Sequence, residues 1–150
     1  MLRFETSMTA MEYEDISADA FGASLQGLGL NLLVRDVRRE VAFLTGVLEL
    51  QSHRVSEDFA ILTYGNQVFQ LHAGHTYGAN PMLGLLPELP PRGAGAELRL
   101  YDTDPDAACA RAQAVGAEVL AAPADKPHGL RESYILSPEG YAWVPSRRIG

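Results

Sequence analysis

The stretch LRESYILSPEGYAWVPS, residues 130–146, is typical of a β-hairpin. Two runs rich in apolar and aromatic residues flank the central segment, as expected for two paired strands. Pro138, Glu139 and Gly140 lie between these runs, and Pro-x-Gly is a sequence that favours a tight turn. The sequence therefore predicts two antiparallel strands joined at this turn.

The residues before this hairpin predict a strand, a helix and a further strand. AELRLYD, residues 96–102, is a strand candidate, and DPDAACARAQAVG, residues 104–116, is a helix candidate. Asp104 can cap that helix and Pro105 suits its first position, while a glycine ends it. AEVLAAP, residues 117–123, then predicts a short strand before the hairpin.

The first half of the chain repeats this order. LGLNLLV, residues 28–34, is apolar enough for a buried strand, and Asp36 follows at a helix-capping position. Apolar residues at Val37, Val41, Leu44 and Leu48 then form one helix face. FAILTYG and QVFQLHA meet at Gly65 and Asn66, which favour a hairpin turn. The sequence thus predicts two copies of one strand–helix–strands unit, at about 27–72 and 94–147, joined by a Pro- and Gly-rich connector at 73–93.

The composition limits the class of protein. The chain has 150 residues, a net charge of −7 and one cysteine. Its basic residues form no stripe and no apolar run approaches the length of a membrane helix, so we expect neither a nucleic-acid nor a membrane partner. A single cysteine excludes an internal disulfide, and the acidic N-terminus does not resemble a secretory signal. We therefore expect a cytoplasmic protein.

Three motifs together resemble the vicinal-oxygen-chelate superfamily, which includes glyoxalase I, bleomycin-resistance proteins and extradiol dioxygenases. LSPEGYAW, residues 136–143, is similar to the Asp-Pro-x-Gly hairpin of that family, with Ser137 in place of the usual Asp. Residues 32–50 and 102–119 resemble the strand–helix segments of its two modules, and the likeness spans residues 27–148. The resemblance implies an α+β fold of two βαβββ modules, forming an open cup-shaped eight-stranded mixed sheet, and commonly a homodimer.

The same resemblance implies a divalent metal held by four strands, but this chain departs from that pattern. The positions that match the family's ligands are Gly29, Gln70, Gly95 or Ala96, and Val144. Only Gln70 has a side chain that could coordinate a metal. We therefore expect no metal or other cofactor, although a shifted register that recruits other side chains remains an alternative.

Side chains that share strand parity with these family ligand positions would line the cup. Polar groups that converge on a cavity favour a ligand site, and we therefore expect a small organic molecule there. One alternative is a metal-dependent lyase or dioxygenase of the same superfamily, and another is a structural or regulatory protein whose cup is closed by its own side chains. No residue is assigned a catalytic role. The predicted ligand-binding residues are Asn31, Gln70, His72, Glu97, Arg99, Glu132 and Tyr134.

Other segments have weaker patterns. Residues 1–26 are predicted to form an N-terminal arm, frayed or docked on a partner, with a short helix capped by Ser17. Together with the apolar connector around Met82, this arm is the expected extra contact of a homodimer. Trp143 is expected to pack against a helix or a partner, and His53, within a polar stretch, is expected to be exposed.

Overall fold

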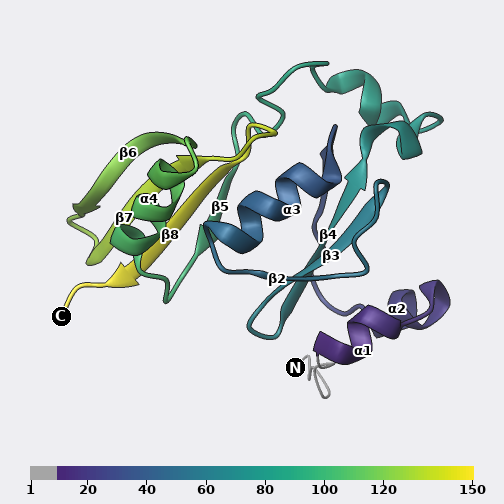
Figure 1. Ribbon diagram of the computed structural model, residues 1–150, viewed down its shortest axis with the longest axis horizontal. Helices are drawn as coiled ribbons and strands as arrows, with labels where there is room; N and C mark the ends of the chain where they lie inside the picture. The colour runs from purple at the N-terminus through teal and green to yellow at the C-terminus, as the bar shows by residue number, and fades with distance from the viewer. Residues whose placement is uncertain (1–9) are drawn as a thin grey trace.

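The computed structural model describes residues 10–150 and contains two βαβββ modules in chain order (Figure 1). Each module has one strand, one helix and three further strands, as the sequence predicts. The first module consists of β1 (Asn31–Val34), α3 (Val37–Gly46), β2 (Gln51–His53), β3 (Phe59–Tyr64) and β4 (Gln67–Ala73).

The second module follows a connector that contains two short 3-10 helices. These are η1 (Gly74–Tyr77) and η2 (Pro81–Leu85). The second module consists of β5 (Glu97–Leu100), α4 (Pro105–Ala114), β6 (Glu118–Asp125), β7 (Leu130–Leu136) and β8 (Ala142–Arg148).

The strands form two four-stranded sheets with the same topology. Sheet A has the order β1-β4-β3-β2, and sheet B has the order β5-β8-β7-β6. The first strand of each module pairs in parallel with the last, and the other pairs are antiparallel. The predicted α+β fold of two βαβββ modules is therefore confirmed. Its eight strands are divided between two open sheets, and no ladder joins these sheets within residues 10–150.

Both predicted helix caps are present. The Asp36 carboxylate accepts a hydrogen bond from the Arg39 backbone N–H at 3.0 Å, and Asp104 accepts two from the first turn of α4. Pro105 occupies the first helical position, where a backbone N–H would have no partner within the helix, so the absence of this group from proline costs nothing. The short helix α2 (Ala18–Ser24) is capped by Ser17, as predicted.

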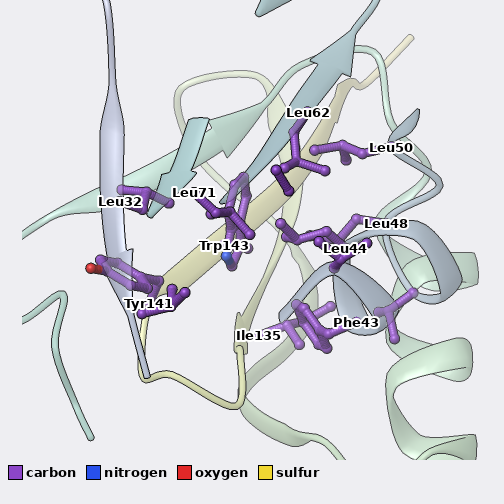
Figure 2. Close-up of a cluster of buried hydrophobic side chains, with 14 of the residues drawn as sticks. Leu32, Phe43, Leu44, Leu48, Leu50, Leu62, Leu71, Ile135, Tyr141 and Trp143 are labelled. Carbon is purple, nitrogen blue, oxygen red and sulfur yellow. The ribbon is translucent and has the colours of Figure 1, made fainter. Parts of the chain in front are cut away.

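One hydrophobic core serves both modules. It contains side chains from α3 and sheet A and side chains from α4 and sheet B, and Figure 2 shows Leu44, Leu71, Ile135 and Trp143 converging in it. The rings of Phe69 and Trp143 lie 5.7 Å apart across the two sheets. Trp143 is only 2% exposed and lies in this core with side chains of α3 and α4. In Figure 1, α3 lies between the two sheets.

The N-terminal arm packs on its own module. Helices α1 (Ala10–Asp15) and α2 bring Tyr13, Ile16 and Phe21 into a second core cluster with Ile61 of β3. Part of the predicted arm, residues 1–9, lies outside the described residues. His53 lies against Tyr13 and is 3% exposed, so the prediction of an exposed His53 was wrong.

The apolar part of the connector does not pack closely on the body of the chain. Met82 is 41% exposed, Leu85 is 85% exposed and Leu89 is 66% exposed. Leu83 and Leu86 are half-buried, so the body of the chain covers this segment only in part, and its expected contact with a partner stays a prediction.

Candidate functional site

The predicted site residues lie on the faces of the sheets that are turned away from α3 and α4. In β1 and β4, the core residues Leu32 and Leu71 alternate with Asn31, Gln70 and His72. Because successive side chains of a strand point to opposite faces, the polar residues lie on the other side of sheet A. The same alternation applies in sheet B. We call these two surfaces the open faces.

A neutral polar strip lies on the open face of sheet A. The His72 Nε2 atom is 2.9 Å from Gln70 Oε1, and Asn31 Nδ2 donates to the Tyr77 hydroxyl at 3.3 Å. The His72 ring lies between the rings of Phe59 and Tyr77, at 5.2 and 5.5 Å. Burial lowers the pKa of His72, which favours its uncharged form near neutral pH. The strip therefore offers amide, imidazole and phenol groups without a formal charge.

A charged cluster lies on the open face of sheet B. Arg99 bonds to the carboxylates of Glu97, at 3.0 Å, and of Glu132. The Tyr134 hydroxyl donates to Glu97 at 2.6 Å, and His128 Nε2 is 3.4 Å from Glu132. These contacts bring together all four site residues predicted in the second module. The same contacts satisfy many polar atoms of these four residues, as expected for the alternative in which the cup is closed by its own side chains.

The pKa values of this cluster follow from its partners. Burial alone would raise the pKa of Glu132, but the Arg99 guanidinium more than offsets this and holds the pKa below its usual value. Hydrogen bonds from Tyr134 and Arg99 lower the pKa of Glu97. Both carboxylates are thus ionised at neutral pH, and with Arg99 they leave one net negative charge when His128 is neutral.

The seven predicted residues form two groups rather than one. Within the described chain, no hydrogen bond or ion pair connects the strip on sheet A with the cluster on sheet B. The reason is the packing of the modules. Their helix-bearing faces share one core, so the two open faces look away from it.

The structure does not fit the metal site that the fold family implies. Gly29 and Gly95 lie just before β1 and β5, and Val144 lies within β8, and none of these residues has a coordinating side chain. The Gln70 oxygen is engaged by His72. Among the residues that the structure describes, no group of three or more His, Cys, Asp or Glu side chains could hold a metal ion.

One groove lies away from the predicted residues. This groove has a volume of about 750 Å³ and runs between α3, the start of β6 and the β7–β8 turn. Its walls include Phe43, Val47, Pro91, Val115 and Pro138, and none of the seven predicted residues lines it. Sequence patterns within one element gave no signal of this groove, because both modules and the connector contribute to its walls.

Two buried carboxylates, also missed by sequence reasoning, join the modules beside this groove. Glu139 of the β7–β8 turn accepts hydrogen bonds from the backbone N–H groups of Arg35 and Asp36 and from the Arg39 guanidinium. Glu40 accepts from the Glu139 backbone N–H at 3.1 Å, and burial raises the pKa of Glu40 to about 7. Since every one of these contacts is internal, we assign this pair to module docking. We call it the turn clamp.

A protein-family model agrees with this fold. The model of the glyoxalase/bleomycin resistance protein/dioxygenase superfamily matches residues 28–144. The chain belongs to this superfamily. The match covers both βαβββ modules of this glyoxalase-superfamily chain and excludes the arm. A comparison with curated protein sequences gives no match.

Solved structures share the fold at low sequence identity. A glyoxalase/bleomycin resistance protein/dioxygenase family enzyme from Burkholderia phytofirmans is 21% identical, with a TM-score of 0.67, over 81% of this chain and 97% of that one. A protein of the same description from Nocardioides is 23% identical, with a TM-score of 0.63, over 86% and 90%. TioX from Micromonospora is 20% identical, with a TM-score of 0.59, over 83% and 100%. At these identities the likeness establishes the fold alone. No helix in the described part of the chain is long and apolar enough to cross a membrane.

Proposed function

We propose that this glyoxalase-superfamily protein binds a small organic molecule on its open faces, without a resident divalent metal. The neutral strip on sheet A is the observation that carries the proposal. Within the described residues the Gln70 amide nitrogen makes no hydrogen bond, although Gln70 is half-buried beside His72. Polar groups that are held in place and left with free donors are what a ligand site provides.

A second copy of the chain would complete the site. The open faces of one chain look away from their common core, so a ligand on sheet A is covered on one side only. We infer a homodimer in which sheet B of the partner faces sheet A. The ligand would then lie between the neutral strip and the charged cluster. Sedimentation at micromolar concentration tests this step, and a monomer would contradict it.

The binding proposal is tested by NMR with a library of small organic fragments and isotope-labelled protein. We expect fragments to shift the side-chain amide signals of Asn31 and Gln70, and the Gln70→Leu variant to lose this response. Gln67→Leu is the matched control, because Gln67 is an exposed glutamine at the start of the same strand. Equal responses in the two variants would overturn the assignment of the strip.

The metal-free part of the proposal has its own measurement. Titration calorimetry with Zn²⁺, Mn²⁺ and Ni²⁺ should give no stoichiometric binding, because three of the four family positions lack a donor. One bound equivalent that Gln70→Leu abolishes would instead favour a metal-dependent lyase or dioxygenase.

A structural role is the second candidate, and one observation favours it. Arg99, Glu97, Glu132 and Tyr134 largely pair with one another. If the Arg99→Ala variant melts at lower temperature while fragment binding is unchanged, the cluster on sheet B serves stability rather than recognition.

A further inference from the structure

The N-terminal arm, here residues 10–26, covers part of the open face of sheet A. Tyr13, Ile16 and Phe21 are 7%, 8% and 6% exposed, and they pack around Ile61 of β3. Ile61 is paired with Gln70 of β4, so the two side chains lie on the same face. The arm and the neutral strip therefore occupy neighbouring parts of one surface.

Polar contacts hold the arm in place. The Arg54 guanidinium donates to the Ile16 carbonyl, and the Arg54 backbone N–H donates to the Glu14 carboxylate at 2.9 Å. Arg54 has a φ of 51°, in the left-handed region that a residue with a side chain seldom adopts. These bonds offset that conformational cost and link the loop after β2 to the end of α1 and to the residue that follows it.

A series of aromatic rings runs from the arm to the strip. Phe21 lies edge-on to Phe59 at 6.2 Å, Phe59 lies edge-on to His72 at 5.2 Å, and His72 contacts Tyr77 at 5.5 Å. The Tyr13 ring also lies edge-on to the Phe21 ring, with the ring centroids 6.0 Å apart. The orientation of the His72 ring thus depends on side chains of the arm through a single intervening ring.

We propose that the arm is a wall of the ligand site: it closes the β2–β3 side of sheet A and, through Phe21 and Phe59, fixes the His72 ring so that a flat, uncharged group is selected at the strip. The proposal rests on the proposed binding function. It makes Phe21 a positioning residue, because Phe21 acts through Phe59 and does not itself reach the strip.

The chemistry of the strip indicates the ligand class. Asn31, Gln70 and Tyr77 are neutral donors and acceptors, and the lowered pKa of His72 keeps the imidazole uncharged. Aromatic rings pair favourably with other planar rings, in offset-stacked or edge-to-face arrangements. A planar ring that bears an amide fits both features. A carboxylate fits less well, because the four side chains of the strip include no cation.

The first experiment tests the wall without any ligand. Phe21→Ala and the milder Phe21→Leu are compared in the full chain with Leu28→Ala, a control at a side chain that is 99% exposed. We expect both Phe21 variants to raise the pKa of His72, measured by NMR titration, towards its ordinary value of about 6.5. We also expect them to increase fluorescence of the dye 8-anilinonaphthalene-1-sulfonate, as apolar surface on β3 becomes accessible.

The Leu28→Ala control should leave both signals at wild-type values. If Phe21→Leu retains the wild-type circular dichroism spectrum but leaves the His72 pKa and the dye signal unchanged, the proposal that the arm forms a wall of the site is contradicted. Phe21→Leu is included because Phe21→Ala could remove too much volume for the arm to fold.

The second experiment tests selection with three probes of similar size. Nicotinamide has a planar ring and an amide, cyclohexanecarboxamide has the amide on a puckered ring, and nicotinate is planar but charged. We expect nicotinamide to bind about three- to tenfold more tightly than the other two, and Phe21→Leu to reduce this preference. Equal affinities for all three in the wild type would overturn the selection. If none of the three probes binds but the Phe21 variants still change the His72 pKa and the dye signal, the proposed binding function is contradicted. The structural role of the arm is then retained.

Discussion

The β3–β4 and β7–β8 hairpins follow one pattern but have different surroundings. In the first module, Gly65 and Asn66 turn between β3 and β4 in full exposure to solvent. In the second, Glu139 and Gly140 are buried, and the Glu139 carboxylate binds the start of α3 in the other module. The second turn therefore supports contact between the modules, whereas the first only connects two strands.

The two open faces differ in a similar way. The face of sheet A is partly covered by the arm, and its remaining polar groups are neutral. The face of sheet B carries the charged cluster around Arg99, and residues 10–26 make no ion pair with this cluster. One topology thus supports two chemically different surfaces, because the fold depends on the helix-bearing faces and leaves the open faces free to vary.

The largest expected effect separates the two turns. Glu139→Ala should lower the free energy of unfolding by about 3–4 kcal/mol, because it removes charge-assisted hydrogen bonds to two backbone N–H groups and to Arg39. Asn66→Ala, at the exposed turn, should change it by less than about 0.5 kcal/mol. Urea denaturation of both variants measures the difference. Similar values for the two would show that the turn clamp does not join the modules.

The second prediction concerns the pH dependence of the turn clamp. The pKa of Glu40 is about 7 in the folded chain and about 4.5 when unfolded, so the unfolded state loses its proton first as pH rises. Stability from this group is therefore complete below about pH 4.5 and falls by about 3 kcal/mol by the time the pH passes 7. Urea denaturation at pH 5 and pH 8 should show this loss in the wild type.

Glu40→Gln removes the titrating group while keeping an oxygen for the Glu139 N–H. We expect this variant to lose that part of the pH dependence and to be more stable than the wild type at pH 8. Glu49→Gln, at an exposed side chain, is the matched control and should follow the wild type. An unchanged slope in Glu40→Gln would show that Glu40 ionises normally in the folded chain.

The smallest expected effect compares the open faces. Glu132→Gln should lower the free energy of unfolding by about 1–3 kcal/mol, because it weakens a nearly buried, charge-assisted contact with Arg99. Gln70→Leu on sheet A should cost less than about 1 kcal/mol, since Gln70 is neutral and half-buried. Thermal unfolding ranks the two, and a larger loss for Gln70→Leu would reverse the assignment of the charged cluster as the more stabilising one.

Local patterns predicted much of this fold. The caps at Asp36 and Asp104 and the turns at Gly65 and Gly140 depend on residues close in sequence, and the structure has them where the sequence placed them. The strand period also placed the polar site residues on the open faces, because alternation follows from backbone geometry alone.

The features that sequence reasoning missed all depend on distant contacts. The turn clamp joins Glu139 to residues about 100 positions earlier, and the polar stretch around His53 gave no sign that Tyr13 would cover it. The groove and the separation of the two polar groups follow from how the modules dock. Docking is decided by side-chain packing between elements, which periodicity within one element does not report.

The turn clamp also bears on how the chain folds as it is synthesised. The residues of helix α3 leave the ribosome together with Asp36, whose carboxylate caps the helix. The buried carboxylate that binds the N–H groups of Arg35 and Asp36 arrives about 100 residues later, in the last hairpin. The N-terminus of α3 thus lacks this carboxylate until the last hairpin is added, and a chain that stops before Glu139 leaves the Arg35 and Asp36 N–H groups without it.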